Sequence, residues 1–160
     1  MPPSKISAGI WVERPGSGTI SMSDKYFLDT NVLVHAYDAH DAGKQAKAQA
    51  VLRRAVETDA GVLSTQVLSE FIVVVTRKIK RPMELDEAQK LVKMFCILPV
   101  VEQTVNQIHS SIELSRKCRI SFWDSMIIAA AKQAGCRLVY SEDLSDGQKY
   151  EGVSVRNPFR

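Results

Sequence analysis

Short apolar runs alternate along the chain with longer segments whose apolar residues recur at helical spacing. The short runs predict strands at 25–29, 61–64, 97–101, 137–141 and 153–155. The longer segments predict helices at about 31–37, 43–58, 65–80, 84–95, 103–117 and 122–134. Strands separated by helices are typical of a parallel sheet that is covered on both faces. The pattern therefore predicts an α/β protein, a three-layer α/β/α fold with a central, mainly parallel sheet.

Two residues mark the ends of predicted helices. Pro82 stops the helix at 65–80, because proline lacks an amide hydrogen and clashes with the preceding turn. Gly135 follows the helix at 122–134 and suits the C′ position, where a left-handed backbone is common.

The first 21 residues differ in composition from the rest of the chain. They contain three prolines, three glycines and several serines without a sustained apolar period. We expect residues 1–21 to be a flexible N-terminal extension, whether a natural tail or a cloning remnant. Residues 22–160 then form one domain, since 160 residues favour a single core.

Charge and cysteine content permit several classes of protein without selecting one. The balance of 21 basic and 18 acidic residues gives a formal charge of +3, which permits a nucleic-acid partner without requiring one. Cys96, Cys118 and Cys136 are odd in number and lack CxxC spacing, which favours buried or inert thiols in a reducing compartment. No apolar stretch approaches the roughly 18–20 residues of a membrane span, and no secretory signal is evident. We expect a cytoplasmic protein without a membrane partner.

Four acidic residues lie near the predicted carboxyl ends of strands, although they are far apart in the sequence. They are Asp29, Glu70, Asp124 and Asp143. In open parallel sheets, ligands bind at this edge. Four carboxylates that meet there repel one another, and a divalent cation with oxygen ligands relieves that repulsion.

Each acid also has a structural alternative. Asp29 can cap the following helix, and Asp124 follows Ser121 in a capping-box pattern. Asp143 stands in a polar turn, where acids are common. Glu70 differs, because its helical neighbours are valines, and a glutamate on an apolar face needs a partner, a ligand or a cleft.

Four segments together resemble the PIN domain family, in particular the VapC-type toxin ribonucleases of bacterial toxin–antitoxin systems. The segments are YFLDTNVL (26–33), LSEF (68–71), ISFWDSMIIAAA (120–131) and LVYSEDL (138–144). The resemblance covers about residues 24–158 and implies a PIN-like nuclease domain. It places Asp29, Glu70, Asp124 and Asp143 on the family's acidic quartet. It also matches Thr30, Asn31 and Ser141 to the family's supporting polar positions.

The resemblance implies an endoribonuclease that depends on Mg²⁺ or Mn²⁺ and hydrolyses RNA phosphodiester bonds. It further implies a homodimer that a cognate antitoxin inhibits. The fourth acid stays open, because Glu142 and Asp146 flank Asp143. Residues 1–21 have no counterpart in the family domain.

Basic and aromatic residues are candidates for RNA contacts. Arg77, Lys78, Lys80 and Arg81 can hold phosphates, or can stabilise the negative end of a helix dipole. For a second cluster, Arg116, Lys117 and Arg119, the helix-end role is favoured. Trp123 can stack on a base, but core packing is the favoured interpretation. His35, His40 and His109 share no ligand spacing, and surface or helix-packing roles are expected.

Two other functions compete with a nuclease. A phosphatase of the haloacid dehalogenase type also begins with a strand-end aspartate, here Asp29, but needs a second aspartate where this chain has Asn31. A non-catalytic α/β binding module would use the acids only as helix caps.

Overall fold

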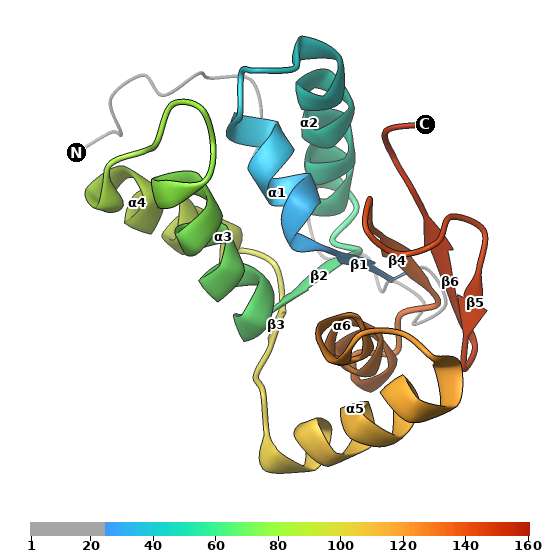
Figure 1. Cartoon of the computed structure of the whole chain (residues 1–160). Helices are drawn as coiled ribbons and strands as arrows, with labels where there is room; N and C mark the ends of the chain where they lie inside the picture. The colour runs from blue at the N-terminus through green and yellow to red at the C-terminus, as the bar shows by residue number, and fades with distance from the viewer. Residues whose placement is uncertain (1–24) are drawn as a thin grey trace.

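A six-stranded sheet forms the centre of the computed structural model, which describes residues 25–160 (Figure 1). The strands are β1 (Tyr26–Leu28), β2 (Gly61–Ser64), β3 (Val100–Val101), β4 (Leu138–Tyr140), β5 (Lys149–Tyr150) and β6 (Val153–Arg156). Their order is β3-β2-β1-β4-β6-β5, and every neighbouring pair is parallel except β5 with β6. The predicted, mainly parallel sheet is therefore confirmed. The predicted extension, residues 1–21, lies outside the described residues.

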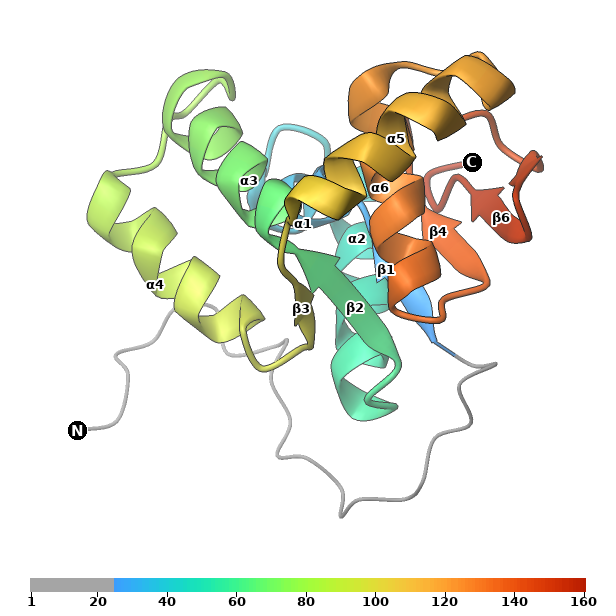
Figure 2. The same cartoon turned by 90° about the horizontal axis from the view of Figure 1, so that it is seen from below.

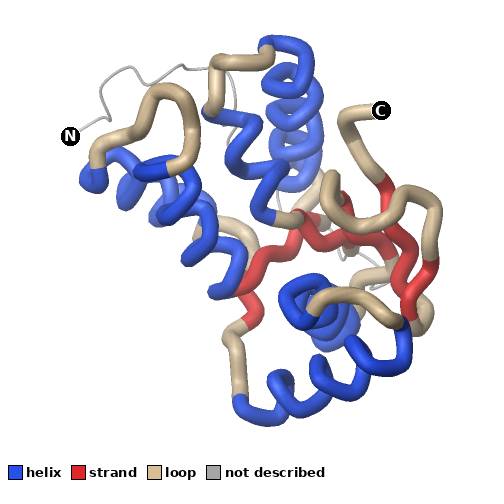
Figure 3. The backbone as a smooth tube through the Cα atoms, viewed as in Figure 1, coloured by secondary structure: helices blue, strands red, loops and turns tan. Residues whose placement is uncertain are grey.

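Helices cover both faces of the sheet, which confirms the three-layer architecture. They are α1 (Thr30–Tyr37), α2 (Ala42–Glu57), α3 (Thr65–Arg77), α4 (Leu85–Phe95), α5 (Val105–Cys118) and α6 (Phe122–Gln133). Figures 1 and 2 show α1 and α2 on one face and α5 and α6 on the other. Helices α3 and α4 flank the β3 edge, where α3 packs against both α1 and α4. The strands form one continuous band between these helices (Figure 3). None of the helices in residues 25–160 has the length and apolar composition that a membrane crossing requires.

Local sequence explains where most helices begin. Five of the six described helices start after an Asp, Ser or Thr whose side chain accepts a hydrogen bond from a first-turn amide. Gly135 has a φ of 74° directly after the cap of α6, and Cys136 N donates to Ala131 O at 2.9 Å. This pair of features is a Schellman ending, which confirms Gly135 at C′.

The core fills the space between the sheet and the helices with closely packed side chains. Phe27 of β1 and Phe71 of α3 are fully buried, and the Phe71 ring meets Phe95 edge-on at 5.1 Å. Gly61 opens β2 beside α2, where a Cβ atom would lie 2.5 Å from the Cβ of Ala55. Glycine is therefore required at this contact for steric reasons.

Two predicted elements need correction, and one strand was missed. The predicted strand 97–101 contributes only β3, because Ile97 and Leu98 fold back as turns on α4 through their amides. The predicted helix 65–80 ends at Arg77, so the helix stops before it reaches Pro82. Strand β5 was not predicted. It pairs with β6 through a two-residue turn, Glu151 and Gly152, both with positive φ, as the twist of a tight hairpin requires.

Candidate functional site

The pairing of β1 with β4 brings the first and last predicted site segments together. Leu28 lies beside Tyr140 in a parallel register, and Asp29 N donates to Tyr140 O at 3.0 Å. Both strands end at the same edge of the sheet, so Asp29 and Ser141 leave it side by side. Asp29 also caps α1, since its Oδ1 accepts from Thr30 N at 2.7 Å. The predicted cap is confirmed, and it leaves the second carboxylate oxygen for other contacts.

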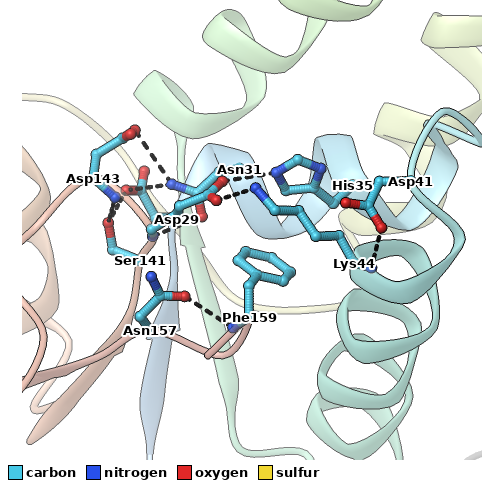
Figure 4. A network of polar contacts seen from close by, with 10 residues as sticks. Asp29, Asn31, His35, Asp41, Lys44, Ser141, Asp143, Asn157 and Phe159 are labelled. Atoms are coloured by element: carbon cyan, nitrogen blue, oxygen red, sulfur yellow. Dashed lines mark hydrogen bonds and ion pairs between the residues drawn. The ribbon is translucent and has the colours of Figure 1, made fainter.

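Ser141 is the centre of a small hydrogen-bond network at this edge (Figure 4). Its hydroxyl donates to Oδ2 of Asp29 at 2.6 Å and accepts from the amides of Asp143 and Leu144, each at 3.2 Å. Ser141 is fully buried. The hydroxyl thus orients the Asp29 carboxylate and shapes the loop that carries Asp143.

Asn31 connects the two aspartates directly. Its Nδ2 lies 3.3 Å from Oδ2 of Asp29 and 3.3 Å from Oδ2 of Asp143. Its Oδ1 accepts from the amide of Glu142 at 3.2 Å. One amide side chain on the first turn of α1 therefore holds both carboxylates and the β4 loop.

Glu70 joins the same site from α3. Thr30 Oγ1 donates to its Oε2 at 2.9 Å, and Gln66 Nε2 donates to its Oε1 at 2.9 Å. The side chain is half-buried. The expectation that a glutamate beside valines must find partners is confirmed.

Asp124, in the first turn of α6, is not part of this network. Its amide donates to Ser121 Oγ at 3.0 Å, so the hydroxyl half of the capping box is present. Its carboxylate makes no hydrogen bond or ion pair with any of residues 25–160. The start of α6 is nevertheless tied to Glu70, because Gln66 Nε2 also donates to Trp123 O at 3.3 Å.

Burial raises the pKa of Asp29 from its ordinary value of 3.8 to about 6. The hydrogen bonds from Ser141 and Thr30 oppose this rise, while the charges of Asp143 and Glu70 add to it. Three carboxylates thus share one electrostatic environment at the sheet edge. Strongly perturbed carboxyls in such clusters are characteristic of functional sites.

The chemistry of the donors suits a hard divalent cation. Within residues 25–160, no group of three or more His, Cys, Asp or Glu side chains already surrounds a common metal position. Mg²⁺ does not require such a cage, because it keeps several waters and binds through one or two carboxylates. Asp29 and Asp143, which share the Asn31 amide, meet this smaller requirement. The residues present therefore fit Mg²⁺ or Mn²⁺.

The structure separates the three candidates for the fourth acid. Glu142 turns away from Asp29 and binds His35 Nε2 at 2.8 Å and Lys44 Nζ. Partial burial raises the pKa of Glu142, but the hydrogen bonds from Lys44 and His35 hold it below its ordinary value overall. Asp146 accepts from Asn157 N at 2.8 Å. Among the three, Asp143 is the acid that shares a partner with Asp29.

His35 and Lys44 are the neighbours that sequence reasoning missed. The His35 ring also packs edge-on against Phe159 at 4.8 Å. His35 lies four residues after Asn31, so it falls on the same face of α1, and that spacing was an available signal. Lys44 comes from α2, and no local pattern indicated its contact with Glu142.

Three of the predicted RNA-binding cations border two different hollows. Lys78 borders a hollow that also contains Glu70, whereas Lys80 and Arg81 line a separate hollow beside the end of α1. Arg77 is exposed on α3. In the second cluster, Lys117 pairs with Glu151, which raises the pKa of Lys117. This pairing agrees with the structural role favoured for that cluster.

Two other expectations about single residues have clear outcomes. Core packing of Trp123 is wrong, because the side chain is 62% exposed. Cys136 is buried, which raises the pKa of its thiol to about 12 and makes it inert, but Cys96 is exposed. All three cysteines are free.

Comparison with known proteins identifies the family. The sequence model of the PIN domain matches residues 26–145, so the chain belongs to the PIN domain family. No curated protein matches the sequence significantly.

Solved structures with the same fold include toxins and toxin–antitoxin complexes. Mycobacterium tuberculosis VapC20, described as a toxin that cleaves the sarcin-ricin loop, is 21% identical, with a TM-score of 0.61 over 74% of this chain and 90% of that one. DNA-bound VapBC from Salmonella typhimurium is 19% identical, with a TM-score of 0.58 over 84% and 98%. A toxin–antitoxin complex from Klebsiella pneumoniae is 15% identical, with a TM-score of 0.63 over 84% and 98%. At these identities the likeness establishes the PIN fold.

Proposed function

We propose that this PIN domain is a metal-dependent endoribonuclease that hydrolyses RNA phosphodiester bonds. The observation that carries the proposal is the shared Asn31 amide, 3.3 Å from a carboxylate oxygen of both Asp29 and Asp143. Glu70 joins through Thr30, and the pKa of Asp29 is raised to about 6. A buried carboxylate held beside the exposed carboxylate of Asp143 is arranged for a cation, not for helix capping by itself.

Asp29 and Asp143 would hold Mg²⁺ or Mn²⁺, with Glu70 and Asp124 on the neighbouring helices completing the acidic site. When bound, the ion would supply a water of lowered pKa and screen the phosphate charge. Ser141 and Asn31 keep the Asp29 carboxylate in one orientation, and Thr30 and Gln66 do the same for Glu70. Such fixed orientation reduces the rearrangement needed when charge develops on the reacting phosphate.

RNA cleavage with and without EDTA tests the assignment. The wild type should cleave in Mg²⁺ or Mn²⁺ and stop in EDTA. Asp29→Asn and Asp124→Asn should each lose cleavage by about 100-fold or more, at or beyond the upper end of losses for residues that only support metal ligands. Circular dichroism should show that both variants stay folded. Cleavage that persists in EDTA would reject a metal-dependent reaction.

A thermal-shift titration separates the nuclease from a non-catalytic binding module. Metal that binds only the folded state raises the melting temperature by linkage. We expect Mn²⁺ to stabilise the wild type and to have little effect on Asp29→Asn. A module that uses its acids only as caps should show no response in either protein. A phosphatase reading is disfavoured because Asn31, as an amide donor between two carboxylates, stands where a second acid is needed.

The toxin role rests on the structural relatives. Two of them are toxin–antitoxin assemblies, which supports an antitoxin partner for this chain. We further propose that the chain forms a homodimer and acts on RNA in the cytoplasm. We expect expression of the chain to inhibit growth, and co-expression of an adjacent gene's product to restore growth and to co-purify with it. Equal toxicity of Asp29→Asn would show that the growth effect does not depend on catalysis.

A further inference from the structure

A hollow of about 510 Å³ lies beside the acidic site, between α3 and the start of α6. Glu70, Val73 and Lys78 line it along α3. Gln103 and Trp123 border it near the first turn of α3, where both contact Gln66. We call this hollow the Trp123 groove. It is continuous with the acidic site, because Glu70 belongs to both.

Trp123 offers an accessible aromatic surface in this groove. The side chain is 62% exposed, and its ring meets Phe122 edge-on at 5.5 Å. Its carbonyl accepts from Gln66 Nε2, which also donates to Glu70. The backbone that carries the ring is therefore fixed relative to the acids. An exposed indole held in this way is suited to stack on a planar group.

The cations at the far end of the groove are available for phosphates. Lys78 lies eight residues after Glu70 on one side of the helix, about 12 Å along its axis. Lys78 and Arg77 are exposed, and neither forms an ion pair with any of residues 25–160. The groove thus holds a carboxylate and an exposed indole towards the start of α3 and a cation directly after its end, which complements a nucleic-acid backbone with an unstacked base.

We propose that the Trp123 groove is a subsite for one unpaired nucleotide next to the scissile phosphate, with its base on Trp123 and a neighbouring phosphate at Lys78. The inference rests on the proposed ribonuclease function and extends it to the substrate. Base-paired RNA does not present the face of a base to a side chain, so the subsite selects unpaired segments. Stacking tolerates any base, so Trp123 sets this structural preference without setting the sequence.

A second copy of the chain is the other occupant that the groove could accept, since Val73 is also 46% exposed. A second copy in the groove would cover Glu70, which belongs to the acidic site. RNA would instead pass from the groove to that site and would use the exposed indole and Lys78. The position of the groove beside the acids therefore favours RNA.

Fluorescence tests binding without any need for activity. The chain has two tryptophans, so Trp11→Phe leaves Trp123 as the sole emitter, and Asp29→Asn prevents cleavage. In this double variant, a single-stranded RNA oligonucleotide should quench the emission with saturation, and the same strand in a duplex should not. Equal quenching by both, or none, would overturn the subsite. Loss of quenching at high protein concentration, together with a larger mass by light scattering, would assign the groove to a second copy.

Steady-state cleavage by the otherwise unmodified protein tests the role in substrate binding. Trp123→Ala should raise KM by about 5- to 150-fold, the range for one stacked base, with kcat little changed, and Trp123→Phe should recover most of the loss. Val105→Ala, at another exposed apolar position, is the matched control and should change nothing. Lys78→Ala should lower the slope of log K for RNA binding against log salt concentration by about 1, the amount expected for one lost phosphate contact.

The outcomes separate the two proposals. Suppose that the wild type cleaves RNA and Asp29→Asn does not. An unchanged KM for Trp123→Ala would then reject the subsite, while the ribonuclease function would be retained. Quenching by single-stranded RNA in a protein that never cleaves would reject the nuclease and leave the groove as an RNA-binding site.

Discussion

The hydroxyl of Ser141 donates to Oδ2 of Asp29 across 112 residues of sequence, at 2.6 Å and out of contact with solvent. This bond joins the loops after β1 and β4, and it fixes the more perturbed carboxylate of the site. The same oxygen accepts hydrogen bonds from the amides of Asp143 and Leu144. Ser141 therefore holds both the Asp29 carboxylate and the loop that carries Asp143.

Ser141→Ala should weaken both metal binding and cleavage. The change leaves the amides of Asp143 and Leu144 without their acceptor and removes one donor from Asp29. We expect Mn²⁺ affinity and kcat/KM to fall by about 10- to 100-fold, and the free energy of unfolding by about 1–3 kcal/mol. Isothermal titration and urea unfolding measure the two effects.

Ser111→Ala is the matched control for that variant. Ser111 is equally buried, but its hydroxyl donates to Gln107 O within α5 and is remote from the acids. It should lose some stability and keep the metal affinity of the wild type. Equal metal affinity in both variants would show that Ser141 does not position Asp29.

The contribution of Asp29 to the stability of the metal-free protein should fall as the pH rises from about 4 to about 6. Asp29 has an ordinary pKa of 3.8 and a pKa of about 6 in the folded chain, so in this interval the folded state keeps a proton that the unfolded state releases. The stability linked to that proton is fully present below pH 3.8 and is lost as the pH passes through about 6. Two pKa units correspond to at most about 3 kcal/mol.

Urea unfolding in EDTA at several pH values, for the wild type and Asp29→Asn, isolates this effect. The difference between their free energies of unfolding should change by up to about 3 kcal/mol across the interval. A constant difference would contradict a raised pKa. Mg²⁺ should oppose the loss in the wild type, because a cation binds the ionised carboxylate.

Substitutions at the three neighbouring acids should give different results. Asp143→Asn should remove most cleavage, because Asp143 shares Asn31 with Asp29. Asp146→Asn should keep it, since Asp146 contacts the C-terminal segment. Glu142→Gln should mainly reduce stability, by up to about 1 kcal/mol, through its pair with Lys44. Full activity in Asp143→Asn with loss in Glu142→Gln would reverse the assignment of the fourth acid.

Gly61→Ala should destabilise the fold. The new methyl group would meet the Cβ of Ala55 at 2.5 Å, and relief requires α2 to move away from the sheet. We expect a loss of about 1–3 kcal/mol, typical of overpacking. Gly43→Ala, at an exposed position in the first turn of α2, should cost less, because its new Cβ would meet only the end of the exposed Asp41 side chain, at 3.3 Å, and alanine favours helix. Calorimetry of both variants is the check, and equal stability would show that α2 accommodates the methyl group.

The sequence by itself determined the order and type of most elements, and the reason is local. Buried strands such as β1 and β2 must be apolar on both faces, and caps such as Ser64, Thr104 and Ser121 sit next to the amides they bind. The hairpin partner β5 was missed because its two residues carry almost no apolar signal, and its Glu151–Gly152 turn is defined by backbone angles.

Asp29 and Asp143 were predicted from the sequence to lie together, because residues that follow parallel strands meet at one edge of the sheet. Only the tertiary structure decided how they are used. It joined Asn31 to both Asp29 and Asp143, paired Glu142 with Lys44, and left the Asp124 carboxylate outside the network. It also exposed Trp123 beside Glu70, where core packing was expected. These outcomes depend on contacts between segments that are about 40 to more than 100 residues apart in the sequence. No local pattern contains such contacts, because they arise only from the order of the strands in the sheet and the packing of the helices on it.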